Sequence, residues 1–136
     1  MSESIDETPS APENDLGPPA LNAVEIRVLG TLIEKARLTP EYYPMTLNGL
    51  TLATNQKTSR DPVTDYDESD VSSALDSLRE KHLALRVDSA GSRVPKYRHL
   101  VRDRWALTPP EEALLAVLML RGAQTLGQLR QRTERL

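Results

Sequence analysis

The amino-acid sequence predicts a mostly α protein with a small β-hairpin, and residues 67–100 carry that prediction. Apolar side chains recur over residues 71–78 at the spacing i, i+3, i+4 and i+7, which is typical of one helix face. Over residues 83–87 the apolar period changes to two, as in a strand. Residues 88–93 form a Gly-containing turn, and residues 94–100 return as a basic strand. A helix followed by a hairpin is how a winged helix-turn-helix ends.

Each expected helix has a start signal in the sequence. A Ser, Thr, Asp or Asn before an apolar run can accept hydrogen bonds from the free N–H groups of the first helical turn. The expected N-cap residues are Asn22, Thr46, Asp67, Thr108 and Thr125. Glu25 and Glu111 lie three residues after two of these caps, at the spacing of a capping box. The expected helices therefore cover residues 21–35, 47–56, 67–80, 109–120 and 125–132.

Composition and pattern divide the chain into four parts. Residues 1–20 are rich in Pro, Ser and acidic residues and contain no aromatic residue, so we expect a disordered acidic tail. Residues 21–100 contain every element of a winged-helix domain. Residues 101–108 form the expected linker. Residues 109–136 repeat the opening order of the first domain, a long apolar helix and then a short polar one, so we expect the first two helices of a second, incomplete winged-helix domain.

Charge is distributed unevenly along the chain, whose formal net charge is -3. Residues 1–20 hold five acidic residues and no Lys or Arg. Residues 61–80 hold seven acidic residues against one Arg, whereas residues 93–104 hold five basic residues against one Asp. An acidic helix is thus followed by a basic hairpin and linker. This distribution of charge says more about possible binding partners than the net charge does.

Composition also excludes several classes of protein. The chain has no cysteine, so it has neither a disulfide framework nor a thiolate metal site. No apolar run approaches the roughly 20 residues that span a bilayer. The acidic N-terminus lacks the basic and apolar regions of a signal peptide. We therefore expect a cytoplasmic protein with no membrane partner, no cofactor and no metal.

Several segments, taken together and in order, resemble the YceH-like family of bacterial proteins. The segments that carry the resemblance are residues 39–44 (TPEYYP), 48–50 (NGL), 55–63 (NQKTSRDPV), 93–97 (RVPKY) and 120–125 (LRGAQT). The resemblance covers nearly everything from Leu21 onward and implies two winged-helix domains in tandem. It implies no established catalytic residue or ligand. Family members usually continue through a complete second winged helix, whereas this sequence ends at Leu136.

The predicted fold and the basic hairpin together favour binding of duplex DNA. In winged helices the third helix usually enters the major groove while the wing contacts phosphate or the minor groove. Lys and Arg supply the sequence-independent attraction to phosphate. The predicted phosphate contacts are Lys57, Arg60, Arg93, Lys96 and Arg98. The only candidates for base contacts are Ser73, Asp76 and Ser77.

The charge of the third helix (residues 67–80) argues against reading of bases. Its outward face is acidic and would repel phosphate, and Arg to guanine is the commoner base contact. The alternative is a protein-interaction or dimerisation adaptor that does not bind DNA, because a fold does not fix a function. We also expect the apolar helix over residues 109–120 to sit in an interface, packed on the first domain, on a second copy or on a protein partner. Both interpretations remain open from the sequence.

An enzyme is the least supported class. The chain has two histidines, His82 and His99. His82 lies at the expected end of a helix, where an imidazolium suits the helix dipole. His99 lies in the basic strand. Neither has a Ser, Cys or carboxylate partner at a known motif spacing, so we predict no catalytic residues.

Overall fold

The computed structural model describes residues 20–136, so nearly all of the expected acidic tail, residues 1–20, lies outside the described residues. The elements are α1 (Ala23–Leu38), the 3-10 helix η2 (Pro40–Tyr42), β2 (Met45–Thr46), α2 (Leu47–Thr54), α3 (Glu68–Glu80), β3 (Ala84–Val87), β4 (Lys96–His99), α4 (Val101–Trp105), α5 (Pro109–Arg121) and α6 (Leu126–Glu134). The prediction of a mostly helical α+β protein is confirmed. None of the helices within this range is both long and apolar enough to cross a bilayer.

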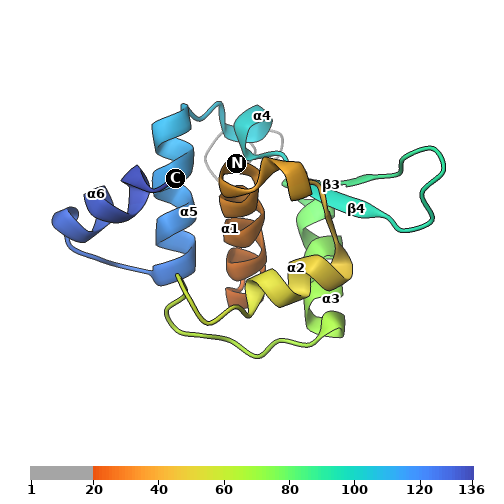
Figure 1. Ribbon diagram of the computed structural model, residues 1–136, viewed down its shortest axis with the longest axis horizontal. Coiled ribbons are helices and arrows are strands. Elements are labelled where there is room, and N and C mark those ends of the chain that lie inside the picture. The colour runs from red at the N-terminus through yellow and green to blue at the C-terminus, as the bar shows by residue number, and fades with distance from the viewer. Residues whose placement is uncertain (1–19) are drawn as a thin grey trace, which may run out of the picture.

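Helix α1 is the centre of the molecule, with α5 on one side and α2 and α3 on the other (Figure 1). The large apolar residues of this helix recur in the sequence at the spacing of one helix face. However, every residue from Val28 to Glu34 is buried, because neighbours cover the helix on several sides. Leu29, Leu32 and Ile33 are completely buried and join side chains from α2, α3 and α5 in one hydrophobic core. Burial of each such side chain stabilises the fold by about 1.5–3 kcal/mol.

The five predicted helices begin at the predicted N-cap residues. Capping boxes form at Asn22, Asp67, Thr108 and Thr125, and the Thr46 side chain accepts a hydrogen bond from the Gly49 N–H. Each cap satisfies backbone donors that the first turn leaves free. The segment 101–108, expected as a linker, contains the short helix α4, and its first residue, Val101, is buried.

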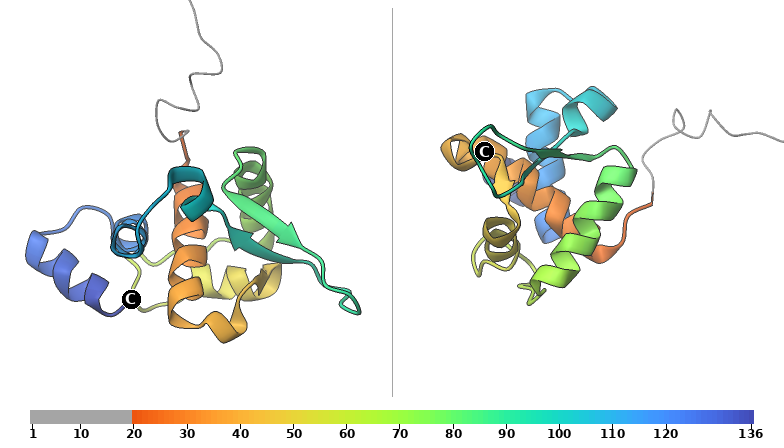
Figure 2. Two further views of the ribbon diagram at one scale, coloured as in Figure 1. Left: turned by 90° about the horizontal axis from the view of Figure 1, so that it is seen from above. Right: turned by 90° about the vertical axis from the view of Figure 1, so that its right-hand side faces the viewer.

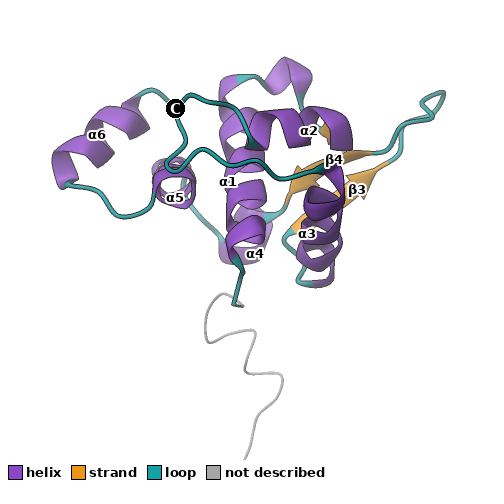
Figure 3. Cartoon of the chain, turned by 90° about the horizontal axis from the view of Figure 1, so that it is seen from below, coloured by secondary structure: helices purple, strands orange, loops and turns teal. Residues whose placement is uncertain are grey.

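The sheet has three antiparallel strands in the order β2-β4-β3. Residues Ala84 and Val87 of β3 pair with His99 and Lys96 of β4, and β2 adds only two residues on the other side of β4. Two residues are too few to give a period in the sequence, which is why β2 is not predicted. The small sheet lies beside α3 (Figure 3). Beyond it, the β3–β4 hairpin projects away from the helices (Figure 2).

Helix α5 packs directly on α1 at Gly30. A Cβ atom at position 30 would lie 2.8 Å from the Met119 Cβ, so the two helices cross at a distance that only glycine permits there. Ala113, Ala116 and Leu120 bury the facing side of α5. Much of the apolar surface predicted to sit in an interface is thus buried within the same chain. The opposite side of α5 stays partly open, with Leu114 38% and Leu118 37% exposed.

Candidate functional site

The β3–β4 hairpin brings together three of the five predicted phosphate contacts. Arg93 is exposed in the turn, and Lys96 and Arg98 lie in β4. Because side chains alternate along a strand, Lys96 and Arg98 share one face while Tyr97 lies on the other, where it packs on the core. Within the described part of the chain, no acidic side chain pairs with these three basic residues. No carboxylate among residues 20–136 therefore neutralises these three charges through an ion pair.

Lys57 lies apart from the hairpin. It is exposed in the loop between α2 and α3. This loop passes under the end of α5, where the Asp61 N–H donates to the Leu120 carbonyl oxygen at 3.0 Å (Figure 1). The hairpin projects from the other side of α1 (Figure 1). The predicted phosphate contacts therefore do not form one continuous patch.

The structure corrects the prediction that Arg60 contacts DNA phosphate. Its guanidinium is buried and donates to both carboxylate oxygens of Glu34, at 2.8 and 3.1 Å. It also donates to the carbonyl oxygens of Ala53 and Ser59, so it fastens the loop to α1 and α2. A side chain engaged in this way cannot contact DNA phosphate from this conformation. The one sequence signal for this pair is that Glu34 falls within the apolar part of α1, where a carboxylate needs a partner.

The candidate base contacts on α3 differ in their surroundings. Ser73 and Ser77 line a small hollow of about 180 Å³ between α3 and the start of α1. Glu25, at the start of α1, is buried and accepts a hydrogen bond from Lys81 Nζ at 2.8 Å. Burial raises the pKa of Glu25, but the hydrogen bonds from Lys81 and the Asn22 backbone and the charge of Lys81 act against it, and the net direction of the pKa shift is downward. Asp76 is exposed, so α3 presents an acidic surface to solvent.

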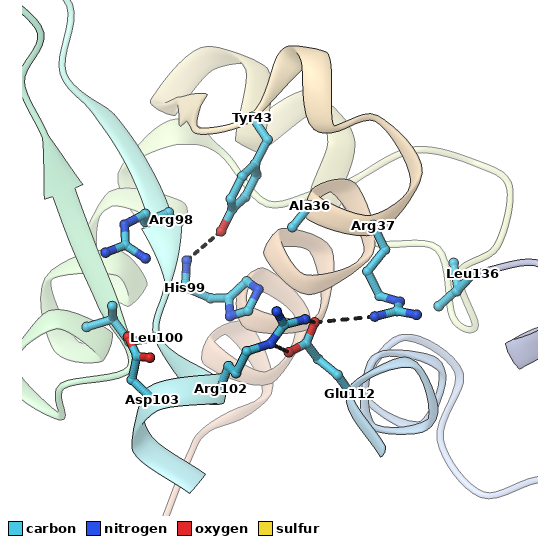
Figure 4. Close-up of a pocket in the computed structure, with 10 residues that line it drawn as sticks. All are labelled: Ala36, Arg37, Tyr43, Arg98, His99, Leu100, Arg102, Asp103, Glu112 and Leu136. Atoms are coloured by element: carbon cyan, nitrogen blue, oxygen red, sulfur yellow. Dashed lines mark hydrogen bonds and ion pairs between the residues drawn. The ribbon is translucent and has the colours of Figure 1, made fainter. Parts of the chain in front are cut away.

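A polar pocket of about 520 Å³ lies at the base of the hairpin, and we name it the basal pocket (Figure 4). It is lined by Ala36, Arg37, Tyr43, Arg98, His99, Leu100, Arg102, Asp103, Glu112 and Leu136. Glu112, from α5, is buried in its wall and accepts hydrogen bonds from Arg102 Nε at 3.0 Å and Arg102 Nη2 at 3.2 Å. Arg37 Nη1, from α1, lies 3.5 Å from the same carboxylate. One acidic side chain thus holds two guanidinium groups at the pocket.

Two neutral polar side chains complete the basal pocket. The Tyr43 hydroxyl accepts a hydrogen bond from the backbone N–H of His99 at 2.6 Å, and their rings lie 6.1 Å apart. His99 Nδ1 accepts from the Val101 N–H at 3.2 Å. Burial lowers the pKa of His99 to about 4, and burial raises the pKa of Tyr43 above its ordinary value. At neutral pH the imidazole is therefore uncharged, with its proton on Nε2, and the phenol keeps its proton.

An apolar groove lies along the open side of α5, and we name it the α5 groove. It has a volume of about 700 Å³ and is lined by Leu21, Ile26, Trp105, Leu107, Glu111, Leu114, Leu115, Leu118 and Met119. Glu111 is the single charged residue of this lining. The sequence predicts an interface role for the helix, but not this groove, because Leu21, Ile26 and Trp105 come from other segments.

Between Ala20 and Leu136, no three His, Asp or Glu side chains gather in a way that could hold a metal ion.

Residues 21–136 match the family described as "Protein of unknown function, DUF480". The chain belongs to the DUF480 family. The family match covers the whole of the region that the structure describes except its first residue.

Relatives of this DUF480 chain include proteins named UPF0502 from several bacteria. The protein from Geotalea daltonii is 60% identical over 116 residues, which cover 85% of this chain and 53% of the relative. The protein from Geobacter sulfurreducens is 58% identical over 116 residues, covering 85% and 52%. The protein from Azoarcus sp. is 50% identical over 132 residues, covering 97% and 57%. The chain therefore spans about half the length of the curated relatives it matches.

Proposed function

We propose that this DUF480 protein is a winged-helix, DNA-associated regulatory protein that holds duplex DNA through its β3–β4 hairpin. The observation that carries the proposal is the set of three basic side chains, Arg93, Lys96 and Arg98, on a projecting hairpin without acidic partners among residues 20–136. The order of α1, α2 and α3 before the hairpin supports a winged helix with the hairpin as its wing.

The contact proposed here is with the DNA backbone. Lys and Arg side chains neutralise phosphates and release counterions, which gives affinity without reading sequence. The acidic surface of α3 opposes the usual approach of a recognition helix to the major groove. Asp76, a base-contact candidate from the sequence, is exposed on this acidic surface, so we propose no base contact for it. The hairpin therefore contacts the DNA backbone, and α3 does not contact the DNA.

Fluorescence anisotropy with a labelled random-sequence duplex tests the proposal. Three phosphate contacts predict that the binding constant falls roughly 40-fold between about 50 and about 200 mM salt, since each contact contributes about 0.9 to the logarithmic slope. Binding that does not change with salt, or no binding at about 50 mM salt, would contradict the proposal.

A second candidate is a protein-interaction or dimerisation adaptor that acts through residues 109–120. The α5 groove favours it, because Leu114 and Leu118 remain more than a third exposed beside Trp105. Light scattering of the protein alone separates this candidate from the first. A tight oligomer that Leu118→Glu dissociates, with no DNA binding, would favour the adaptor. Leu126→Glu is the matched control, because Leu126 is 84% exposed and lies outside the groove.

A further inference from the structure

The basal pocket contains more hydrogen-bond donors than its own acceptors use. Arg102 contacts Glu112 through Nε and Nη2, which leaves Nη1 for another acceptor. Arg37 contacts the same carboxylate through Nη1 alone, and its Nε is buried without an acceptor from the described residues. Because buried polar groups are nearly always hydrogen-bonded, the buried Arg37 Nε indicates a missing acceptor.

The two neutral side chains add donors to the same space. His99 carries its proton on Nε2, since Nδ1 accepts from the Val101 N–H. The Tyr43 oxygen accepts from the His99 N–H, so its own hydroxyl proton remains free to be donated. Figure 4 shows His99 between Tyr43 and the pair of Arg102 with Glu112.

The charge of the pocket also favours a ligand that supplies hydrogen-bond acceptors. Three arginines line it, from α1, β4 and α4, against the two carboxylates of Asp103 and Glu112. Both oxygens of Glu112 already accept from guanidinium groups. The side chains of the lining thus have a net positive charge, and both oxygens of its buried carboxylate are engaged. A ligand that supplies several acceptor oxygens and a negative charge satisfies both conditions.

We propose that the basal pocket is a binding site for a small oxyanion, a molecule that carries a phosphate or carboxylate group. Arg37 and Arg102 bind its oxygens, and His99 and Tyr43 donate further hydrogen bonds. A pocket of about 520 Å³ suits a small metabolite and is far too small for a DNA duplex. The site therefore goes beyond the proposed DNA contact and does not depend on it.

An NMR titration of the whole chain tests this site, with inorganic phosphate, citrate and chloride added at matched ionic strength. We expect saturable shifts of the amide signals of Arg37, His99 and Arg102 with phosphate, with citrate or with both, and none with chloride. The anion that saturates identifies the class of ligand. Shifts that grow linearly with all three salts would overturn the proposal.

Two pocket variants and one control variant extend the titration. Arg102→Gln removes a largely exposed side chain and leaves Arg37 beside Glu112, and we expect it to weaken anion binding about tenfold. Arg86→Gln is the matched control, because Arg86 is another exposed arginine paired with one acid, Asp88, and lies outside the pocket. Arg98→Gln, a second pocket variant, should weaken binding less. Equal affinity in all three variants and the wild type would overturn the proposal even if DNA binding is found.

Discussion

At the scale of single residues, buried glutamates join segments that are far apart in the chain. Glu25 and Glu34 of α1 and Glu112 of α5 are each at most 2% exposed. Each contacts a basic side chain of another segment: Lys81 after α3, Arg60 before α3, and Arg102 of α4 together with Arg37. A carboxylate in an apolar interior is tolerated only with such partners. These pairs therefore define how other segments of the chain attach to α1 and α5.

The pair of Arg60 and Glu34 gives the first prediction. Arg60→Met leaves the Glu34 carboxylate buried without its main partner, so the free energy of unfolding should fall by about 3–5 kcal/mol. Urea unfolding followed by circular dichroism measures the loss. Arg79→Met is the control, since Arg79 pairs with Asp76 in an exposed position and should change stability by less than about 1 kcal/mol. Equal losses in both variants would show that Arg60 does not stabilise the core.

His99 gives the second prediction, a loss of stability on mild acidification. Burial lowers its pKa from 6.5 to about 4, so between these pH values the unfolded chain binds the proton and the folded chain does not. The stability that this group contributes is complete above pH 6.5 and is lost as the pH falls toward 4. At about 1.4 kcal/mol for each pH unit in that window, the loss approaches about 3 kcal/mol.

Comparison with His99→Asn isolates the effect of His99 from that of the carboxylates. The Asn oxygen can accept the Val101 N–H as Nδ1 does, but it does not titrate. Chemical unfolding at several pH values should show that the stability of the wild type falls more steeply than that of the variant between pH 6.5 and 4. Parallel curves would rule out a buried neutral imidazole.

At the scale of elements, the close crossing of α1 and α5 fixes the position of both the basal pocket and the α5 groove. One side of α5 supplies Glu112 to the pocket, and the open side supplies Leu114 and Leu118 to the groove. The crossing depends on the absence of a side chain at Gly30. A change at this one contact would move both sites.

Gly30→Ala gives the third prediction. Alanine favours a helix by up to about 1 kcal/mol, but the added Cβ meets the Met119 Cβ at 2.8 Å, and that atom cannot move without the helix. We expect a net loss of about 1–2 kcal/mol in the free energy of unfolding. Gly127→Ala in α6 is the control, because nothing lies within 4 Å of its added Cβ, and it should stabilise by about 0.5 kcal/mol. Stabilisation by both substitutions would contradict the close crossing.

Much of the fold can be predicted from the sequence because helix starts are local signals. The caps at Asn22, Asp67 and Thr108 depend on residues three positions away, and all three form as predicted. The burial of Arg60 against Glu34 cannot be predicted from a local signal, because Glu34 lies 26 residues earlier. The basal pocket is likewise assembled from α1, β4, α4 and α5, so no local pattern indicates it.

At the scale of the whole molecule, charge is separated between two neighbouring surfaces. The hairpin carries Arg93, Lys96 and Arg98, which have no acidic partner among residues 20–136, whereas α3 presents Asp76 and Glu80 to solvent. If the hairpin binds phosphate, neutralising the hairpin and neutralising α3 should have opposite effects on affinity. A general attraction between a basic protein and DNA would not distinguish the two surfaces. This chain has a net charge of -3, so its net charge does not supply such an attraction.

The slope of the DNA-binding constant against salt, compared between two variants and the wild type, tests this account most directly. Lys96→Ala removes one phosphate contact, so its logarithmic slope should be smaller by about one and its affinity lower on every sequence. Asp76→Asn should keep the slope and raise the affinity, because it removes a repelling charge. An unchanged slope in Lys96→Ala, or weaker binding in Asp76→Asn, would contradict DNA binding through the hairpin.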